Sequence, residues 1–323
     1  MKELKYGKCA QVLAQQDCIL ILTHRNPDGD TVGSAAALCS ALRRAGKKAF
    51  LYPNPQITGH LRAYAEEFIA RNGEEEYCDF CVAVDVAEEH LFAKGFEGKV
   101  DLCIDHHEAN SHYAVRELVK ADCAACGELI LKVIKAMGST PTAQEATLLY
   151  MAIATDTGCF QYSNTDAMSF AAASELAGLG ADLGRVSGDF FRKVSMARLK
   201  LEGEIYSSLS FHRDGKITVA TVTQEMLERT GASEDDCGDL AGLAGRVEGS
   251  LVSVTIRERP EGGCRVSVRS APGISSCDIC AVFGGGGHTL AAGCTISASP
   301  EKTKEMLLAV IDEIWNERDP SDR

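Results

Sequence analysis

Short apolar runs that are followed within two residues by an acid or an imidazole restrict the fold of this chain more than any other feature. Three of them occupy residues 18–22, 80–84 and 100–104. The polar residues that follow them are His24, Asp85 and Asp105. Near-continuous apolar runs of this length are typical of strands in parallel sheets, which are buried on both faces. Because ligands bind beyond the carboxyl ends of such strands, we expect these side chains to meet at one edge of the sheet.

Helix-like segments alternate with these runs in the first half of the chain. A helix is expected over residues 31–45, a further strand over 49–52 and another helix over 61–71. The helix-like stretch 146–155 ends directly at Asp156. This alternation predicts an α/β fold, in which helices cover both faces of a parallel sheet.

The last third of the chain has a different pattern, in which strands succeed one another before two helices. Strands are expected over 216–222, 251–257 and 264–269, and helices over 277–283 and 300–315. A chain of 323 residues is long enough for two hydrophobic cores. We therefore predict a parallel-sheet domain over residues 1–188, a connecting helix over 189–210 and a smaller α+β domain over 211–323.

The net charge of −13 bears on the kind of partner that the chain can hold. Proteins that follow a long polyanion usually present a basic stripe, and no cluster rich in Lys and Arg occurs in this sequence. A short substrate is therefore expected, and long duplex nucleic acid is not. The N-terminus is charged, and no apolar run approaches the roughly 18 residues of a membrane-spanning helix. We expect a cytoplasmic protein with no membrane partner. The sequence leaves open whether the protein forms a homodimer.

The 14 cysteines are scattered, and several of them, such as Cys18, lie inside apolar runs. Together with the cytoplasmic prediction, this favours reduced and buried thiols over disulfides. Two pairs have the spacing Cys-x-x-Cys, at Cys123 with Cys126 and at Cys277 with Cys280. Both lack the flanking glycine or histidine of a zinc knuckle, so a metal or redox role is the less favoured interpretation.

The polar residues near the strand ends include ligands for more than one metal ion. They are His24, Asp28, Asp30, Asp85, Asp105, His106, His107 and Asp156. Carboxylates with a minority of imidazoles suit Mn²⁺ better than Mg²⁺, which favours oxygen alone, or Zn²⁺, which favours nitrogen and sulfur. We predict two Mn²⁺ ions, with Mg²⁺ or Co²⁺ as alternatives, because divalent cations would balance the converging aspartates. This ligand set indicates a two-metal hydrolase.

The order and spacing of these residues resemble those of the DHH phosphoesterase superfamily. The pattern is His24-Arg25-Asn26-Pro27-Asp28-Gly29-Asp30, then Asp85, then Asp105-His106-His107, then Thr155-Asp156-Thr157-Gly158. In the last third, Ser267-Val268-Arg269-Ser270 and the run from Phe283 to His288 are similar to the DHH-associated domain. Within the superfamily, the chain is most similar to the nanoRNase branch. This resemblance implies hydrolysis of short oligoribonucleotides, dinucleotides included, to mononucleotides, and of 3'-phosphoadenosine 5'-phosphate (pAp) to AMP and phosphate.

The resemblance also implies a role for each ligand of the first, catalytic domain. One ion would be held by His24, Asp28 and Asp85. The other would be held by Asp30, Asp85, His106 and Asp156. Asp85 would thus bridge the two ions, Asp105 would orient a histidine ring, and His107 would contact the phosphoryl group that is cleaved.

The glycine run in the last third is interpreted as part of a clamp for the substrate. Four glycines let backbone N–H groups approach a ligand closely, and the planar fork of Arg269 suits a phosphate group. The predicted contacts are Arg269, Ser270, Gly285, Gly286, Gly287 and His288. The run lacks the Lys-Ser/Thr of a Walker loop, so binding of a nucleoside triphosphate is not expected.

Other functions stay open on the same ligand set. One is a phosphodiesterase for linear or cyclic dinucleotides, such as pApA or c-di-AMP, and another is a pyrophosphatase. A nucleotide sensor that binds without cleavage is the non-enzymatic alternative. A bridging carboxylate argues against the sensor, since binding alone has no need of one.

Overall fold

The computed structural model describes residues 2–238 and 240–318, and it divides into two compact units between Lys193 and Val194. This division falls inside the segment 189–210, which we predicted as a connecting helix. The helix that follows the division, α8 (Met196–Ser207), packs within the second unit. In the two described ranges, no helix is long and apolar enough to cross a membrane.

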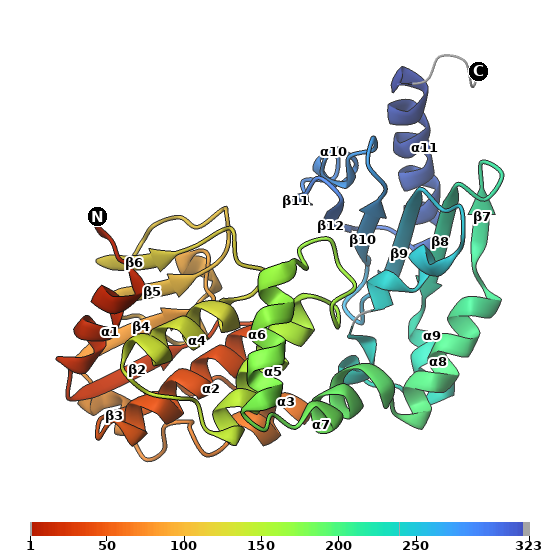
Figure 1. The fold of residues 1–323 in the computed structure, drawn as a ribbon. Coiled ribbons are helices and arrows are strands. Elements are labelled where there is room, and N and C mark those ends of the chain that lie inside the picture. Colours follow the sequence, from red (N-terminus) through yellow and green to blue (C-terminus); the bar gives the residue numbers. More distant parts are fainter. Residues whose placement is uncertain (1, 239, 319–323) are drawn as a thin grey trace. The chain divides into compact units, whose positions relative to one another are not determined.

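The first unit is built on a sheet with the strand order β1-β6-β5-β4-β2-β3, in which every neighbouring pair is parallel (Figure 1). The strands are β1 (Lys2–Glu3), β2 (Cys18–Leu22), β3 (Lys48–Leu51), β4 (Phe80–Val84), β5 (Leu102–Asp105) and β6 (Arg116–Val119). The predicted α/β class with a parallel sheet is confirmed. Because β2, β4 and β5 are neighbours, their carboxyl ends lie side by side at one edge.

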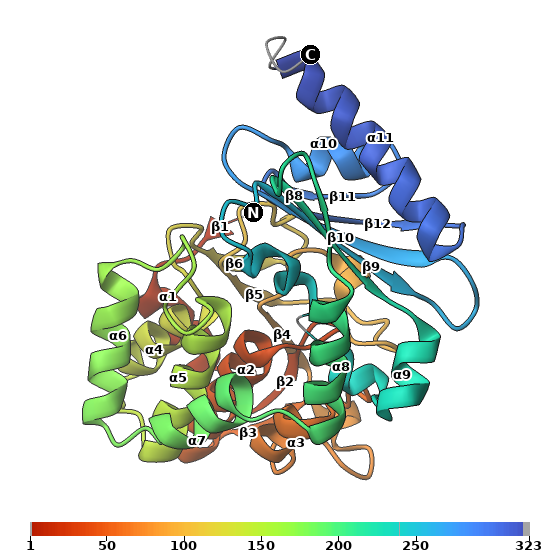
Figure 2. The same ribbon diagram turned by 90° about the vertical axis from the view of Figure 1, so that its right-hand side faces the viewer.

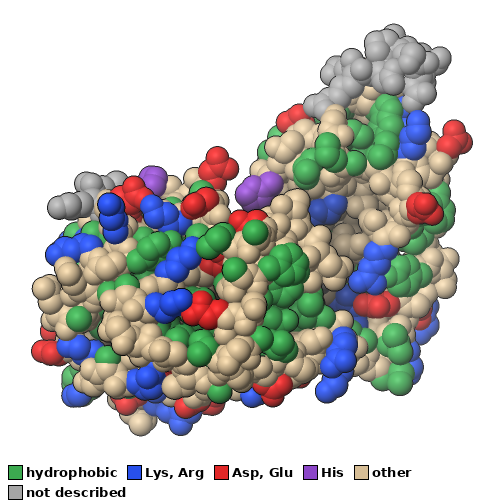
Figure 3. All heavy atoms as spheres, in the orientation of Figure 1, with side chains coloured by type: hydrophobic (Ala, Val, Ile, Leu, Met, Phe, Trp, Pro, Cys, Tyr) green, Lys and Arg blue, Asp and Glu red, His purple; other side chains and the backbone are tan. Residues whose placement is uncertain are grey.

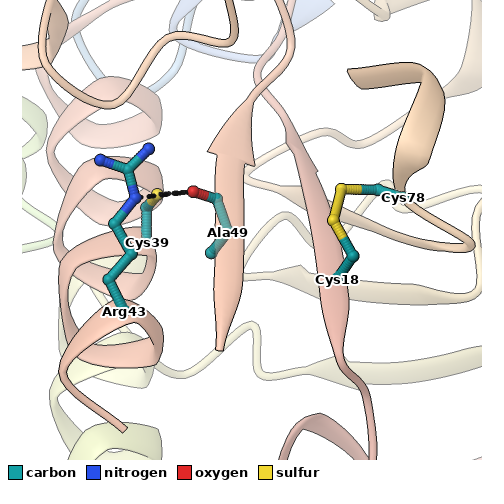
Figure 4. Close-up of a disulfide and its surroundings, with 5 residues drawn as sticks. All are labelled: Cys18, Cys39, Arg43, Ala49 and Cys78. Carbon is teal, nitrogen blue, oxygen red and sulfur yellow. Dashed lines mark hydrogen bonds between the residues drawn. A yellow bond between two sulfur atoms is a disulfide. The ribbon is translucent and has the colours of Figure 1, made fainter. Parts of the chain in front are cut away.

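The helices of this unit share one hydrophobic core with one face of the sheet. They are α1 (Tyr6–Ala14), α2 (Gly29–Arg44), α3 (Gly59–Ala65), α4 (Cys126–Ala136), α5 (Ala143–Asp156), α6 (Ala167–Gly178) and α7 (Leu183–Ser187). Figure 4 shows Cys39 and Arg43 of α2 beside β3, where both donate hydrogen bonds to the carbonyl of Ala49, at 3.2 and 2.7 Å. These bonds fasten α2 to the outer strand of the sheet.

We expected helices on both faces of the sheet, but apolar and aromatic side chains from a connecting segment cover the opposite face. Ala83 of β4 belongs to a separate apolar cluster, against which Phe92 and Phe96 pack. These two rings meet edge to face, with their centroids 5.6 Å apart. They lie in the connection from β4 to β5, which holds only the short 3₁₀ helix η2 (Glu89–Leu91) among its described residues. Glycines interrupt this connection, so aromatic side chains close the face in place of a helix.

Glycines allow α2 and α5 to approach each other closely. A Cβ atom on Gly33 would lie 2.4 Å from the carbonyl oxygen of Leu148, and one on Gly29 would lie 2.4 Å from Oγ1 of Thr155. Such distances are shorter than any stable contact, so a side chain at either position would push the helices apart. The close approach places the first turn of α2 beside the last turn of α5.

Replacing Gly33 by alanine is expected to destabilise the first unit by about 1–3 kcal/mol, the usual range for overpacking. The obstacle is a backbone oxygen, which no change of rotamer can move away. Thermal and urea denaturation measure the effect. Gly7→Ala in α1 is the matched control, because a Cβ there meets nothing within 4 Å and alanine favours a helix. An unchanged midpoint for the G33A protein would contradict the packing argument.

The helix predicted over residues 61–71 is shorter than expected, because α3 ends at Ala65. The N–H of Leu51 donates to the carbonyl of Phe68 at 2.8 Å, and the N–H of Ala70 donates to the carbonyl of Leu51 at 2.9 Å. This segment therefore runs beside β3 as an extended bridge. Pairing with the open edge of β3 satisfies main-chain groups of both segments, and a longer helix would leave that edge bare.

Cys18 and Cys78 form a disulfide, with their Cα atoms 4.7 Å apart (Figure 4). The prediction of reduced thiols is wrong for this pair. Cys18 starts β2 and Cys78 comes two residues before β4, and the register that pairs Ile19 with Phe80 brings them together. No short-range pattern shows this, because 60 positions separate them in the sequence. The other twelve cysteines, all within the described ranges, are free, and both Cys-x-x-Cys pairs are among them.

The second unit contains a mixed sheet with the strand order β11-β12-β10-β9-β8-β7, which Figure 1 shows and Figure 2 presents from the side. Its strands are β7 (Ser210–His212), β8 (Ile217–Val222), β9 (Val252–Glu258), β10 (Cys264–Ser270), β11 (Gly286–His288) and β12 (Ala291–Ile296). The helices α10 (Ser276–Ala281) and α11 (Pro300–Arg318) pack on one face, and α8 and α9 (Gln224–Thr230) pack on the other. The predicted α+β architecture and the hairpin of β9 with β10 are confirmed, whereas β7, β11 and β12 have no counterpart among the predicted strands.

Candidate metal centre

The predicted ligands of the first unit gather where neighbouring strands end. His24 follows β2, Asp85 follows β4 and Asp105 ends β5. Asp28 caps α2, and Asp156 is the last residue of α5. Parallel pairing and the close approach of α2 to α5 thus bring together side chains from five separate elements.

The first group of candidate ligands consists of His24, Asp28 and Asp85. Oδ1 of Asp28 accepts hydrogen bonds from the N–H groups of Asp30 and Thr31, both at 3.0 Å, and so caps α2. Its other oxygen, Oδ2, lies 3.6 Å from Nε2 of His24. Nε2 of His24 is also 3.7 Å from Oδ2 of Asp85. Helix capping therefore fixes how Asp28 presents its free oxygen.

The second group consists of Asp30, His106 and Asp156. Asp30 is only 1% exposed, and its carboxylate accepts hydrogen bonds from Ser34 Oγ at 2.9 Å, Gly127 N–H at 3.0 Å and Cys126 N–H at 2.6 Å. The last two N–H groups lie in the first turn of α4, where they have no partner within the helix and the helix dipole favours an anion. Ser34 is not among the predicted site residues, although its position four residues after Asp30 on a helix is a usable signal.

His106 is oriented by the main chain. Its Nδ1 lies 3.1 Å from the carbonyl oxygen of Cys123, which can only accept, so Nδ1 carries a proton. Nε2 then faces three carboxylates, at 3.4 Å from Asp85, 3.6 Å from Asp30 and 3.6 Å from Asp156. This arrangement aims the nitrogen that can bind a cation at the centre of the cluster.

Asp85 is the buried centre of the site: it belongs to the first group, and its Oδ1 lies 3.4 Å from Nε2 of His106 in the second group. It is 2% exposed, and its backbone adopts a left-handed conformation with φ of 61°, which is uncommon for a residue other than glycine. Among the described residues, its Oδ1 has no hydrogen-bond partner. A buried carboxylate oxygen without a partner is costly in a folded protein. A cation bound between the two groups would satisfy it.

The electrostatics of the cluster also favour bound cations. Burial and the neighbouring carboxylates of Asp85 and Asp156 raise the pKa of Asp30 well above its usual value. Burial likewise raises the pKa of Asp156 to about 6. Burial disfavours the charged form of His106, but the surrounding carboxylates outweigh this and raise its pKa to about 11. Positive charge is therefore what this cluster requires.

The pair Asp105 and His107 adjoins the cluster. Oδ1 of Asp105 accepts hydrogen bonds from Nδ1 of His107 at 2.7 Å and from the N–H of His106 at 2.8 Å. The bond to Asp105 raises the pKa of His107, whose side chain is 38% exposed. Asp105 thus orients the ring of His107, whereas Cys123 orients that of His106. His107 also forms a third candidate ligand group with Asp85 and His106, so geometry alone leaves it two roles.

Three of the six predicted clamp residues of the second unit line one pocket of about 610 Å³. Arg269, Gly285 and Gly286 line it, together with Arg265. Arg265 is not among the predicted contacts, although it shares the solvent-facing side of β10 with Arg269 by the alternation of a strand. Two guanidinium groups on one strand suit a phosphate-bearing ligand.

Several predicted clamp residues also have contacts that support the fold of the second unit. Oγ of Ser270 donates to the carbonyl of Ile274 at 2.7 Å and lies 2.9 Å from Oγ of Ser276. A Cβ on Gly285 would lie 2.3 Å from the carbonyl oxygen of Gly293, and one on Gly287 would lie 2.6 Å from that of Ala291. These glycines are therefore needed for the close pairing of β11 with β12. His288 is exposed at the end of β11.

Comparison with known proteins agrees with this architecture. Residues 18–153 match the DHH family, N-terminal domain, and residues 214–317 match the DHHA1 domain. The chain is 38% identical over 299 residues to the bifunctional oligoribonuclease and PAP phosphatase NrnA of Thermus thermophilus, which covers 89% of this chain and 87% of that one. It is 24% identical to the cyclic-di-AMP phosphodiesterase PdeA of Listeria monocytogenes, over 94% of this chain and 49% of that protein.

A solved structure shares the fold across both units. An exopolyphosphatase-related protein from Bacteroides fragilis superposes with a TM-score of 0.85 and 20% identity, covering 95% of this chain and 96% of that one. At this identity the likeness concerns the fold alone. The sequence relatives carry the assignment further, because their matches span almost the whole chain. The chain therefore belongs to the DHH phosphoesterase family, as a hydrolase with a DHH domain, a DHHA1 domain and NrnA-type oligoribonucleases among its relatives.

Proposed function

We propose that this chain is a Mn²⁺-dependent phosphoesterase that hydrolyses short oligoribonucleotides to mononucleotides and pAp to AMP and phosphate. The observation that carries the proposal is the buried carboxylate of Asp85, which belongs to one ligand group with His24 and Asp28 and to another with His106 and His107. Among the described residues its Oδ1 has no hydrogen-bond partner. The similarity to the Thermus thermophilus oligoribonuclease and PAP phosphatase supports the substrate class.

The donor set fits two divalent cations. His24, Asp28 and Asp85 would hold one, and Asp30, Asp85, His106 and Asp156 would hold the other. Four carboxylates with two imidazoles favour Mn²⁺ over Mg²⁺ or Zn²⁺. When bound, such a pair of cations lowers the pKa of water and neutralises the oxygens of a phosphoryl group.

The chain's own residues supply orientation and charge. Asp105 accepts a hydrogen bond from the Nδ1–H of His107, which leaves Nε2 of that ring to face a phosphoryl oxygen. The hydrogen bond to Asp105 raises the pKa of His107, which favours the positively charged form of the ring. The charge that grows on the phosphoryl oxygens during hydrolysis would meet this cation in a partly buried site.

The substrate is proposed to be short. Figure 3 shows Lys and Arg interspersed with Asp and Glu over the face in view, and the net charge of the chain is −13. A long polyanion would gain little from such a surface. Arg265 and Arg269 on β10 would instead hold a single phosphate group.

Arg269→Ala is expected to raise KM for pAp and dinucleotides about tenfold with little change in kcat. A phosphate contact of this kind exists in both the ground state and the transition state, so its loss weakens binding in both. Steady-state kinetics at saturating Mn²⁺ measure the effect. Arg259→Ala, which removes an exposed arginine paired with Glu261 on the same hairpin, is the control. An unaltered KM in R269A would place the clamp elsewhere.

One assay tests the proposed function as a whole. The purified protein with Mn²⁺ is given labelled RNAs of two to ten nucleotides, pAp, pApA, c-di-AMP and pyrophosphate. Fast turnover of dinucleotides and pAp, with slower turnover of longer strands, supports the proposal. No turnover of any substrate, with ligand binding retained, would favour a nucleotide sensor.

A dinucleotide phosphodiesterase is the second candidate. It is favoured by the similarity to the Listeria monocytogenes cyclic-di-AMP phosphodiesterase, although the chain spans about half of that protein. Preferential cleavage of c-di-AMP or pApA over pAp in the same assay would support this alternative. The predicted cytoplasmic location is a separate point, which cell fractionation tests.

A further inference from the structure

A buried asparagine completes the hydrogen bonds of Asp105. Asn110 follows Asp105 by five residues, and the turn between them is closed by a hydrogen bond from the N–H of Asn110 to the carbonyl of His107 at 3.3 Å. Nδ2 of Asn110 donates to Oδ2 of Asp105 at 2.6 Å. Asp105 is fully buried and Asn110 is 6% exposed, so water is excluded from this contact.

The amide of Asn110 has only one orientation that fits its neighbours. Its Oδ1 accepts a hydrogen bond from the N–H of His112 at 2.8 Å, and its Nδ2 also lies 3.6 Å from Sγ of Cys103. Turning the amide over would set its oxygen against the carboxylate of Asp105 and its NH₂ against a main-chain donor. Both exchanges are unfavourable, so the donor that faces Asp105 is fixed.

The two oxygens of Asp105 therefore have separate tasks. Oδ1 accepts hydrogen bonds from Nδ1 of His107 and from the N–H of His106, and Oδ2 accepts one from Nδ2 of Asn110. Without Asn110, Oδ2 would be a buried anionic oxygen with no donor, and rotation of the carboxylate would recover a bond only by weakening that to His107. Burial alone would raise the pKa of Asp105, but hydrogen bonds from His107 and Asn110 help to hold it below the usual value.

We propose that Asn110 is a positioning residue, which fixes the rotation of the Asp105 carboxylate and thereby aims the ring of His107 at the phosphoryl group. The proposal rests on the role given to His107 under the proposed function. Asn110 would act through a hydrogen bond to the residue that orients the functional histidine. Removal of such a partner usually lowers activity about 10- to 100-fold.

Asn110→Asp tests the donor with almost no change of shape. It sets a carboxyl group 2.6 Å from Oδ2 of Asp105, so the melting temperature is expected to fall. At a temperature where the variant is fully folded, kcat is expected to be about 10- to 100-fold lower, with KM and bound Mn²⁺ close to those of the wild type. Ser111→Ala is the matched control from the same turn, because Oγ of Ser111 donates to the carbonyl of Ala87 at 3.2 Å and not to Asp105. Unchanged kcat in folded N110D, or a fall that tracks lost metal, would overturn the proposal.

An exchange of the two side chains gives a sharper test. In Asp105→Asn, the new amide must accept from His107 with its oxygen, and its NH₂ then faces the NH₂ of Asn110. In the double variant D105N/N110D, the carboxylate at position 110 accepts from that NH₂, so the bond re-forms in the opposite direction. We expect kcat of the double variant to exceed that of D105N about tenfold. A double variant no faster than D105N would mean that Asn110 acts through general packing.

A spectroscopic readout separates this proposal from the proposed function. In metal-free protein with ¹⁵N-labelled histidine, the Nδ1–H of His107 should give a downfield proton signal, identified by its loss in His107→Gln. We expect that signal to shift or broaden in N110D and to remain in S111A. A signal unaffected by N110D contradicts the role of Asn110. Wild-type protein that shows the signal but cleaves no substrate would instead contradict the proposed function.

Discussion

Asp85→Ala is expected to reduce turnover of every substrate by about 10³-fold or more, since it removes a carboxylate that belongs to the first ligand group and lies 3.4 Å from Nε2 of His106 in the second. Loss of cations that supply several kcal/mol of transition-state stabilisation has an effect of this size. Metal analysis of the purified protein should show that bound Mn²⁺ falls together with activity. Retained activity at the same Mn²⁺ concentration would refute the shared ligand.

The stability of the D85A protein distinguishes loss of metal from loss of fold. Wild-type protein should gain melting temperature when Mn²⁺ is added, because a ligand that binds only the folded state stabilises it. The variant should lack this gain. Without metal, D85A should still unfold in one cooperative transition, because the change removes ion pairs with His24 and His106 but leaves strand β4 unaltered. Asp79→Ala, at the exposed opposite end of β4, is the control.

His107→Ala is expected to lower kcat about 10²- to 10³-fold while leaving the content of bound metal intact. A decrease of this size is typical when an enzyme loses one hydrogen-bond donor to the charge that develops in the transition state. The reason is geometric: Nδ1 is committed to Asp105 at 2.7 Å, so Nε2 is the nitrogen left for the substrate. Steady-state kinetics and metal analysis measure the two effects separately.

The same variant also decides between the two roles that geometry allows for His107. Loss of one metal equivalent in H107A would mean that His107 is a ligand and that the roles of His106 and His107 are exchanged. His60→Ala, which removes an exposed histidine of α3, controls for general effects of replacing an imidazole. That control should retain both activity and metal.

The parallel sheet and its polar edge could be predicted because the information is local. The run 80–84 is apolar throughout, coincides with β4 and is followed directly by Asp85. His24 and Asp105 then lie at the ends of the two strands that flank β4, which is a consequence of parallel pairing. The roles of these residues stay predictions, but their convergence is a finding of the structure.

Features that depend on pairing across long separations could not be predicted in this way. Residues 286–288 are a glycine run with no strand propensity, and they form β11 only because β12 offers main-chain partners. The disulfide of Cys18 with Cys78 depends on strand register, which the sequence shows only once the strand order is known. Asn110 has no signal at all in the sequence, because it is one polar residue in a polar turn.

One oxygen of Asp28 caps α2 and the other faces the metal centre, which affects how quickly and how tightly the site can bind a cation. One oxygen is held by the main chain of α2, so the side chain has little rotamer freedom left to lose when an ion arrives. The ligand is preorganised by the same bonds that start the helix. An asparagine at position 28 could retain the cap while giving up the charge, and would thereby separate local folding from ion capture.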